Sequence, residues 1–210
     1  MTIRVDGRYK LGFVHIPKTS GTSIKTWIQE IATRRGDFKI KELPFHAPLP
    51  SLRVPSDYTT CSVIRNPWDR LVSIYEYDDY CRLNSPPEGG FPRLAGKPEE
   101  HMGFRDWIKY IDRYHWVYPQ DKDYNVTKMW FTPTTPQTVW LPWDPHILIR
   151  YENLGQGYEL LHEIMQCHDI SIGHEYNTKH GPYQDYYDDA SRKIVEHYFK
   201  LDIDRWNYKF

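Results

Sequence analysis

Residues 12–28 read Gly-Phe-Val-His-Ile-Pro-Lys-Thr-Ser-Gly-Thr-Ser-Ile-Lys-Thr-Trp-Ile, and this stretch decides the fold. A short apolar run comes first, and a hydroxyl-rich turn with one lysine follows it at residues 18–23. Beyond the turn, apolar residues recur at helical spacing. They are Ile24, Trp27, Ile28 and Ile31. The stretch therefore predicts a strand, a turn and a helix with one buried face, in that order.

The predicted turn is suited to bind phosphate or sulfate. The first N–H groups of a helix and the positive end of its dipole point at whatever lies before the helix. Gly21 allows the backbone to approach a ligand closely, and Lys18 adds a full charge. Thr22 and Ser23 add hydroxyl donors. The turn differs from a Walker A loop, whose lysine follows the second glycine, because Lys18 precedes Gly21 by three residues. The alternative interpretation is a turn whose hydroxyls only cap the helix.

Composition favours one intracellular domain, residues 1–210. A formal net charge of −1 argues against a general nucleic-acid binder. The three cysteines form no Cys-x-x-Cys pair, which fits a reducing compartment. The sequence shows neither the apolar segment of a signal peptide nor an apolar run long enough for a membrane span, so we expect a cytoplasmic protein. We expect no metal, because no ligand cluster with typical spacing is evident.

A second strand-to-helix junction follows residues 58–64, which are rich in β-formers. Asn66 is a good N-cap, and Pro67 suits the first position of a helix. Arg65 stands at the mouth of this junction, and Ser73 lies about two turns into the helix. An arginine at a helix N-terminus opposes the dipole unless an anion binds between them. Two such junctions imply one ligand with two anionic groups.

The two motifs, residues 17–23 and 63–73, resemble the nucleotide-binding signatures of the sulfotransferases that use 3′-phosphoadenosine 5′-phosphosulfate (PAPS). They are most similar to the carbohydrate, Golgi-type branch and its bacterial relatives. In that family the first motif grips the 5′-phosphosulfate, and an arginine and a serine eight residues apart hold the 3′-phosphate. Arg65 and Ser73 keep this spacing. The resemblance implies an α/β fold of the P-loop-like three-layer kind, with a central, mainly parallel sheet flanked by helices.

The same resemblance implies the residues that bind the nucleotide. They are Pro17, Lys18, Thr19, Ser20, Gly21, Thr22, Ser23, Arg65, Ser73, Lys179 and His180. Lys18 and His46 are the catalytic candidates. Lys18 would neutralise the charge on the leaving oxygen. His46 would be the base, because family members that act on uronic-acid-type sugars carry a catalytic histidine between the two motifs. The alternative for His46 is a loop histidine that bonds to a carbonyl, and Lys179 and His180 fit a solvated turn equally well.

The resemblance implies that the protein is an enzyme, a sulfotransferase. It would move a sulfuryl group from PAPS to an acceptor hydroxyl and release 3′-phosphoadenosine 5′-phosphate (PAP). The expected acceptor is a saccharide or another hydroxyl-bearing small molecule, and residues 83–103 and 114–136 are the candidate acceptor-side loops. One alternative is a P-loop kinase or NTPase, which would need a Walker lysine and a Mg²⁺-binding aspartate. The other is a non-catalytic module of the same fold that binds PAP or carbohydrate.

Overall fold

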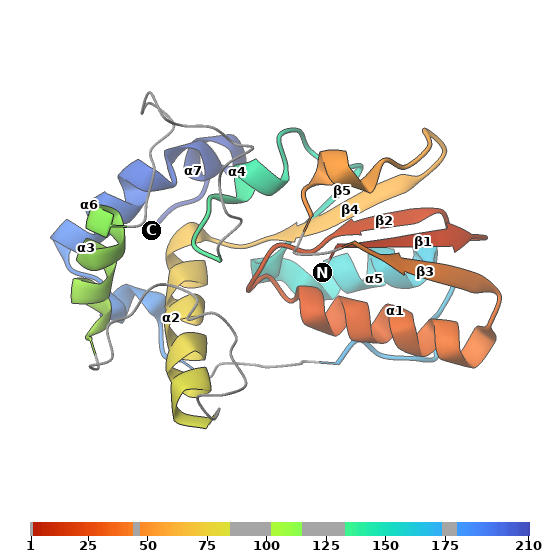
Figure 1. The fold of residues 1–210 in the computed structure, drawn as a ribbon, viewed down its shortest axis with the longest axis horizontal. Coiled ribbons are helices and arrows are strands. Elements are labelled where there is room, and N and C mark those ends of the chain that lie inside the picture. The colour runs from red at the N-terminus through yellow and green to blue at the C-terminus, as the bar shows by residue number, and fades with distance from the viewer. Residues whose placement is uncertain (1, 44–46, 85–101, 115–132, 174–179) are drawn as a thin grey trace. The chain divides into compact units, whose positions relative to one another are not determined.

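The computed structural model describes most of the chain and divides it into two compact units (Figure 1). The described residues are 2–43, 47–84, 102–114, 133–173 and 180–210. The first unit consists of Met1–Arg65 and Gln137–Asn177, and the second consists of Asn66–Pro136 and Thr178–Phe210. Each unit therefore takes two separate segments of the chain, and the expectation of one domain stays a prediction.

A sheet of five strands, counted over the described residues, forms the centre of the first unit. The strands are β1 (Ile3–Gly7), β2 (Leu11–Val14), β3 (Phe38–Glu42), β4 (Thr59–Ile64) and β5 (Ile147–Arg150), in the spatial order β3-β1-β2-β4-β5. β2 pairs with β4 in parallel, and β4 pairs with β5 in parallel. β1 is antiparallel to both β2 and β3, so it alone among these five runs against the rest. The predicted mainly parallel sheet is confirmed.

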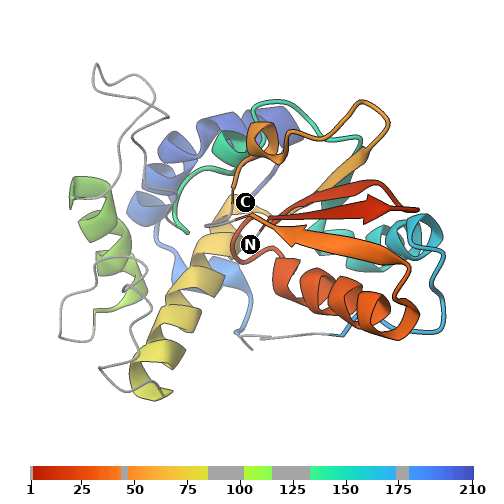
Figure 2. The same cartoon turned by 45° about the vertical axis from the view of Figure 1, so that its right-hand side comes forward.

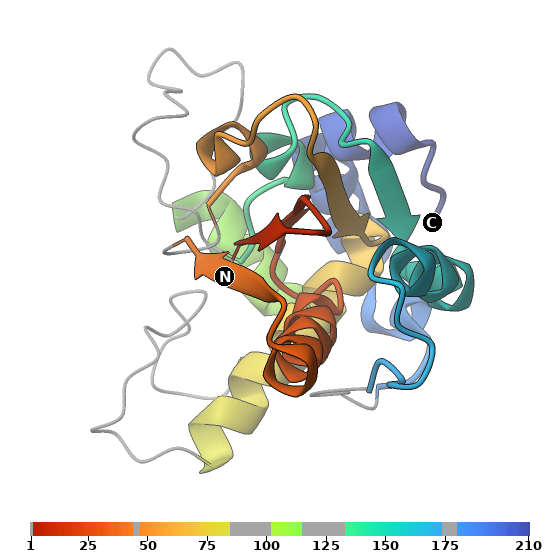
Figure 3. The same ribbon diagram turned by 90° about the vertical axis from the view of Figure 1, so that its right-hand side faces the viewer.

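Helices flank this sheet. α1 (Gly21–Arg35) and α5 (Leu154–Ile164) share one apolar core with the strands, and Figures 2 and 3 show α1 running along the sheet. On the other face of β2, the short helix η1 (Leu49–Leu52) brings a Leu52 methyl to 3.0 Å from where a Cβ on Gly12 would lie. The layers confirm the α/β class that the sequence predicts.

The buried face of α1 is the one that the apolar spacing predicts. Ile24, Ile28 and Ile31 are fully buried, and the Trp27 indole N–H donates a hydrogen bond of 2.8 Å to the carbonyl oxygen of Ile170. Burial of each of these side chains stabilises the fold by about 1.5–3 kcal/mol. The core therefore fixes where α1 begins, and with it the turn that precedes the helix.

The hairpin partner β1 is an element that the sequence interpretation missed. Ile3 and Val5 are buried, whereas Arg4 and Asp6, which alternate with them along the strand, form an ion pair of 2.8 Å on the more exposed face. This pair lowers the pKa of Asp6, and the Tyr58 hydroxyl, which donates to the same carboxylate, lowers it further. The alternation of apolar and charged residues is typical of a strand, but it covers only one short segment.

The second unit is helical in the residues that the structure describes. Its elements are α2 (Pro67–Asn84), α3 (Phe104–Tyr114), η3 (Tyr183–Tyr186), α6 (Asp189–Tyr198) and α7 (Lys200–Trp206). The predicted N-terminus of α2 is confirmed, since the Trp68 N–H donates to Asn66 Oδ1 at 3.0 Å. Leu83 and Asn84, which the sequence assigns to a loop, belong to α2 instead, because this helix continues to Asn84.

Gly157 provides a test of the packing of α5 on the sheet. A Cβ at this position would lie 2.2 Å from Cγ2 of Ile149, a buried β-branched residue of β5, whose side chain is stiff. We expect Gly157→Ala to lower the free energy of unfolding by about 1–3 kcal/mol in urea denaturation. Gly155→Ala on the same helix is the matched control, because nothing lies within 4 Å of its Cβ. Equal stability of the two variants would contradict the packing described here.

Candidate active site

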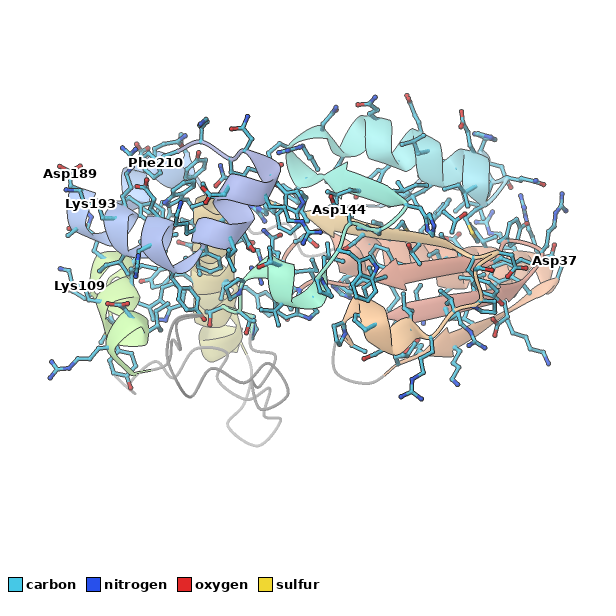
Figure 4. All side chains as sticks on the ribbon, turned by 90° about the horizontal axis from the view of Figure 1, so that it is seen from above. Asp37, Lys109, Asp144, Asp189, Lys193 and Phe210 are labelled. Atoms are coloured by element: carbon cyan, nitrogen blue, oxygen red, sulfur yellow. The ribbon has the colours of Figure 1, made fainter. Side chains whose placement is uncertain are left out.

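Two turns meet at one edge of the sheet. Residues 15–20 connect β2 to α1, and Arg65 follows β4 directly. Because β2 and β4 are parallel neighbours, their carboxyl ends lie at the same edge. Asp37, which Figure 4 labels, lies in the turn between α1 and β3 at the opposite end of the strands. The carboxyl edge is where α/β proteins bind their ligands.

Arg65 contacts the first turn directly. Its Nη1 donates a hydrogen bond of 3.2 Å to the carbonyl oxygen of Lys18. Its guanidinium lies over the ring of Tyr151, 3.9 Å from the ring centroid, and the residue is 4% exposed. The structure therefore joins the Arg65 side chain of the second motif to the Lys18 backbone of the first. Charge-assisted hydrogen bonds from arginine to an anion are among the strongest in proteins.

The first turn has a strained backbone. Lys18 and Ser20 have φ values of 65° and 69°, in the left-handed region that favours glycine, at a cost of about 1–2 kcal/mol for each residue. Thr19 lies between them, and its hydroxyl donates to the carbonyl oxygen of Ile16 at 2.9 Å. Turns of this kind aim N–H groups into a concavity that binds anions, and strain of this size is concentrated at functional sites.

Ser20 does not act as the cap that the alternative interpretation requires. It occupies the N-cap position of α1, but its side chain makes no capping hydrogen bond. Its hydroxyl instead lies 2.7 Å from the hydroxyl of Tyr158 on α5, and burial raises the pKa of Tyr158, which keeps that phenol neutral. The first turn of α1 contains no acidic residue. The positive end of the helix dipole is therefore not offset by a carboxylate of its own first turn.

The packing of His15 leaves no room for a side chain at position 21, so glycine is needed there even without a ligand. A Cβ on Gly21 would lie 2.0 Å from Cδ2 of the His15 ring. His15 is 6% exposed and stacks on Phe13, with the ring planes at 28°. The sequence interpretation assigned this glycine to the close approach of a ligand, and the structure gives it a packing reason as well. His15 is a residue of the turn that sequence reasoning did not single out.

Gln137 holds the backbone of Arg65. It is the first residue of α4 (Gln137–Trp140) and is fully buried. The Arg65 N–H donates to Gln137 Oε1 at 2.9 Å, and Gln137 Nε2 donates to the Arg65 carbonyl oxygen at 2.8 Å. No local pattern in the sequence indicates this contact. The position of Tyr151 near Arg65 could have been inferred from the sequence. Tyr151 directly follows β5, Arg65 directly follows β4, and residues that follow neighbouring parallel strands meet at one edge of the sheet.

Ser73 and His180 belong to the second unit. Ser73 is buried on α2 and follows Asp69 by four residues, so the two share one face of that helix. His180 Nε2 lies 3.7 Å from Asp69 Oδ1, and His180 Nδ1 lies 2.8 Å from the Gly181 carbonyl oxygen. A carboxylate therefore lies beside two of the residues that were predicted to bind phosphate, and their role stays a prediction.

Several predicted residues are not placed. His46, Lys179 and most of both acceptor-side loops, residues 85–101 and 115–132, lie outside the described residues. The remaining members of the first motif are placed around the turn, with Pro17 and Ser23 buried and Thr22 half-buried.

Other kinds of site find little support in the part of the chain that is described. Burial raises the pKa of Cys61 to about 12 and also raises that of Cys167, so neither of these thiols suits nucleophilic catalysis. Among the described residues, no group of three or more His, Cys, Asp or Glu side chains is arranged to hold a metal ion. None of the described helices combines the length and the apolar character that crossing a membrane requires.

Comparison with known proteins identifies the class. The family model described as "Sulfotransferase family" matches residues 1–209. The match spans nearly the whole chain, and the protein therefore belongs to the sulfotransferase family, whose general reaction is sulfuryl transfer. The search of curated proteins gave no match, and the search of solved structures gave none either.

The contact between Gly21 and His15 makes a prediction about stability. We expect Gly21→Ala to lower the free energy of unfolding by about 1–3 kcal/mol, because the new methyl group overlaps the buried imidazole. His15→Ala removes that ring, so the double variant should be more stable than the sum of the two single losses predicts. Gly103→Ala, with nothing within 4 Å of its Cβ, is the control. Additive losses in urea unfolding would contradict the proposed overlap.

Proposed function

We propose that this protein is a PAPS-dependent sulfotransferase that transfers the sulfuryl group to a hydroxyl of a saccharide. Membership of the sulfotransferase family supports the reaction class. The observation that carries the proposal is the hydrogen bond from Arg65 to the Lys18 carbonyl, since it joins the two separate motifs at one edge of the sheet. A ligand with two anionic groups matches this arrangement.

The described residues fit such a nucleotide. The first turn presents strained backbone at Lys18 and Ser20, and α1 begins without a carboxylate in its first turn. Residues 17–23 would hold the 5′ group, and Arg65 with Ser73 would hold the 3′-phosphate. Lys179 and His180 are further candidates for phosphate contacts. PAPS supplies the activated sulfuryl group, and the protein supplies positioning and charge.

The protein's own contribution is electrostatic. Sulfuryl transfer resembles phosphoryl transfer, in which an enzyme aligns the partners and stabilises developing charge. The Lys18 ammonium would neutralise the charge that builds up on the leaving oxygen. A base would take the proton of the acceptor hydroxyl, and we propose His46 for this role because histidine titrates near neutral pH. The formal net charge of −1 favours a saccharide that is not highly sulfated, because a polyanion would need a basic groove.

Calorimetry and a transfer assay test the proposed function. We expect PAP to bind without added metal and ATP with Mg²⁺ to bind much more weakly. The purified protein should then release PAP from PAPS when a saccharide acceptor from a panel is added. Tight binding of ATP with Mg²⁺ in place of PAP would favour a kinase or NTPase. Binding of PAP with no transfer to any saccharide would favour a non-catalytic module.

Replacement of Lys18 should affect catalysis more than binding. We expect Lys18→Ala to lower kcat by roughly 10²–10³-fold, the usual cost of losing one group that stabilises charge in the transition state. The Kd for PAP should change by less than about tenfold, since backbone N–H groups and Arg65 would still bind the nucleotide. Lys39→Ala, an exposed lysine on β3, is the control. A Lys18→Ala enzyme with turnover near that of wild type would show that the charge role is assigned to the wrong residue.

A further inference from the structure

We propose that Gln137 is a positioning residue: it fixes the backbone of Arg65 and thereby makes the site select nucleotides that carry a 3′-phosphate. This inference rests on the proposed function, because it assumes that Arg65 binds the 3′-phosphate of PAPS and PAP.

The geometry of the contact supports this role. The last pair between β4 and β5 is Ile64 with Arg150, so the ladder between these strands ends one residue before Arg65. Gln137 extends it, because its amide accepts from the Arg65 N–H at 2.9 Å and donates to the Arg65 carbonyl oxygen at 2.8 Å. These are the two bonds that a residue of an antiparallel strand exchanges with its partner. A side chain thus replaces a strand at the position where the arginine leaves the sheet.

Contacts thus fix both the backbone and the guanidinium of Arg65. Gln137 holds its backbone, while the ring of Tyr151 and the Lys18 carbonyl hold its guanidinium, at 3.9 Å and 3.2 Å. A long side chain loses less freedom on binding when it is held in place beforehand. Both polar atoms of the Gln137 amide are directed at the backbone of Arg65. Gln137 therefore acts through Arg65, and we do not assign it a contact with the nucleotide.

The ratio of the affinities for two nucleotides distinguishes a positioning role of Gln137 from a merely structural one. A structural glutamine would, when replaced, weaken the binding of every nucleotide by a similar factor or lower the folded fraction. A positioning glutamine would weaken only the ligand that uses Arg65. PAP and adenosine 5′-monophosphate (AMP) form the matched pair of probes, because AMP lacks only the 3′-phosphate.

The experiment is calorimetric titration of PAP and AMP into wild type and Gln137→Met, which keeps the approximate length of the side chain without the amide. We expect wild type to bind PAP roughly 100-fold more tightly than AMP, the worth of charge-assisted hydrogen bonds to one phosphate. In Gln137→Met this ratio should fall by roughly tenfold, with the Kd of AMP nearly unchanged. Far-UV circular dichroism and a thermal melt establish that the variant is folded.

Three further variants sharpen the result. Gln137→Asn keeps both polar groups on a shorter side chain and should recover part of the lost preference for PAP. Gln29→Met makes the same change on α1, where the glutamine amide donates to Glu42, and should keep the wild-type ratio. In an Arg65→Ala background, which lacks the guanidinium, Gln137→Met should leave the PAP-to-AMP ratio unchanged.

Two outcomes overturn the inference. One is a folded Gln137→Met protein with the wild-type PAP-to-AMP ratio, and the other is equal weakening of both ligands. If Gln137→Met does not fold, the same comparison made with Gln137→Asn decides, and an unchanged ratio there overturns the inference as well. A wild-type protein that binds PAP no better than AMP would instead overturn the proposed function on which the inference rests.

Discussion

The parallel pairing of β2 with β4 is the constraint on which the site depends. It sets the carboxyl ends of both strands at one edge, so that Arg65 reaches the carbonyl oxygen of Lys18. The apolar core beneath the sheet holds this register, because slipping one strand by a single residue would turn its buried side chains toward the opposite face. The chemistry of the turn is thus positioned by packing at some distance from it.

Three side-chain contacts hold the turn between β2 and α1 in place. The Thr19 hydroxyl bonds to Ile16, the Ser20 hydroxyl bonds to Tyr158, and the ring of His15 packs against Gly21. These contacts maintain two non-glycine residues in the left-handed region, which an isolated peptide would rarely adopt. Under the proposed function, a turn held in this way would lose less free energy to reorganisation when the nucleotide binds.

Local signals in the sequence were sufficient for the elements that carry the two motifs. Helical spacing predicted the buried face of α1, and Asn66 with Pro67 predicted the start of α2, because these signals depend on neighbouring residues only. β1 was missed because its alternation spans five residues. The contact between Gln137 and Arg65 joins residues 72 positions apart, so only the folded chain reveals it. The reason for Gly21 was incomplete, since a close approach to a ligand and a close approach to His15 both require glycine.

The shared space of Gly21 and His15 has an evolutionary consequence. A homologue with a side chain at position 21 would need a smaller residue at position 15, because the imidazole occupies the volume where that side chain would begin. The two positions are thus expected to change together as sequences diverge. A homologue that carries a side chain at position 21 and keeps a large residue at position 15 would mark a lineage in which the loop ahead of α1 has taken another shape.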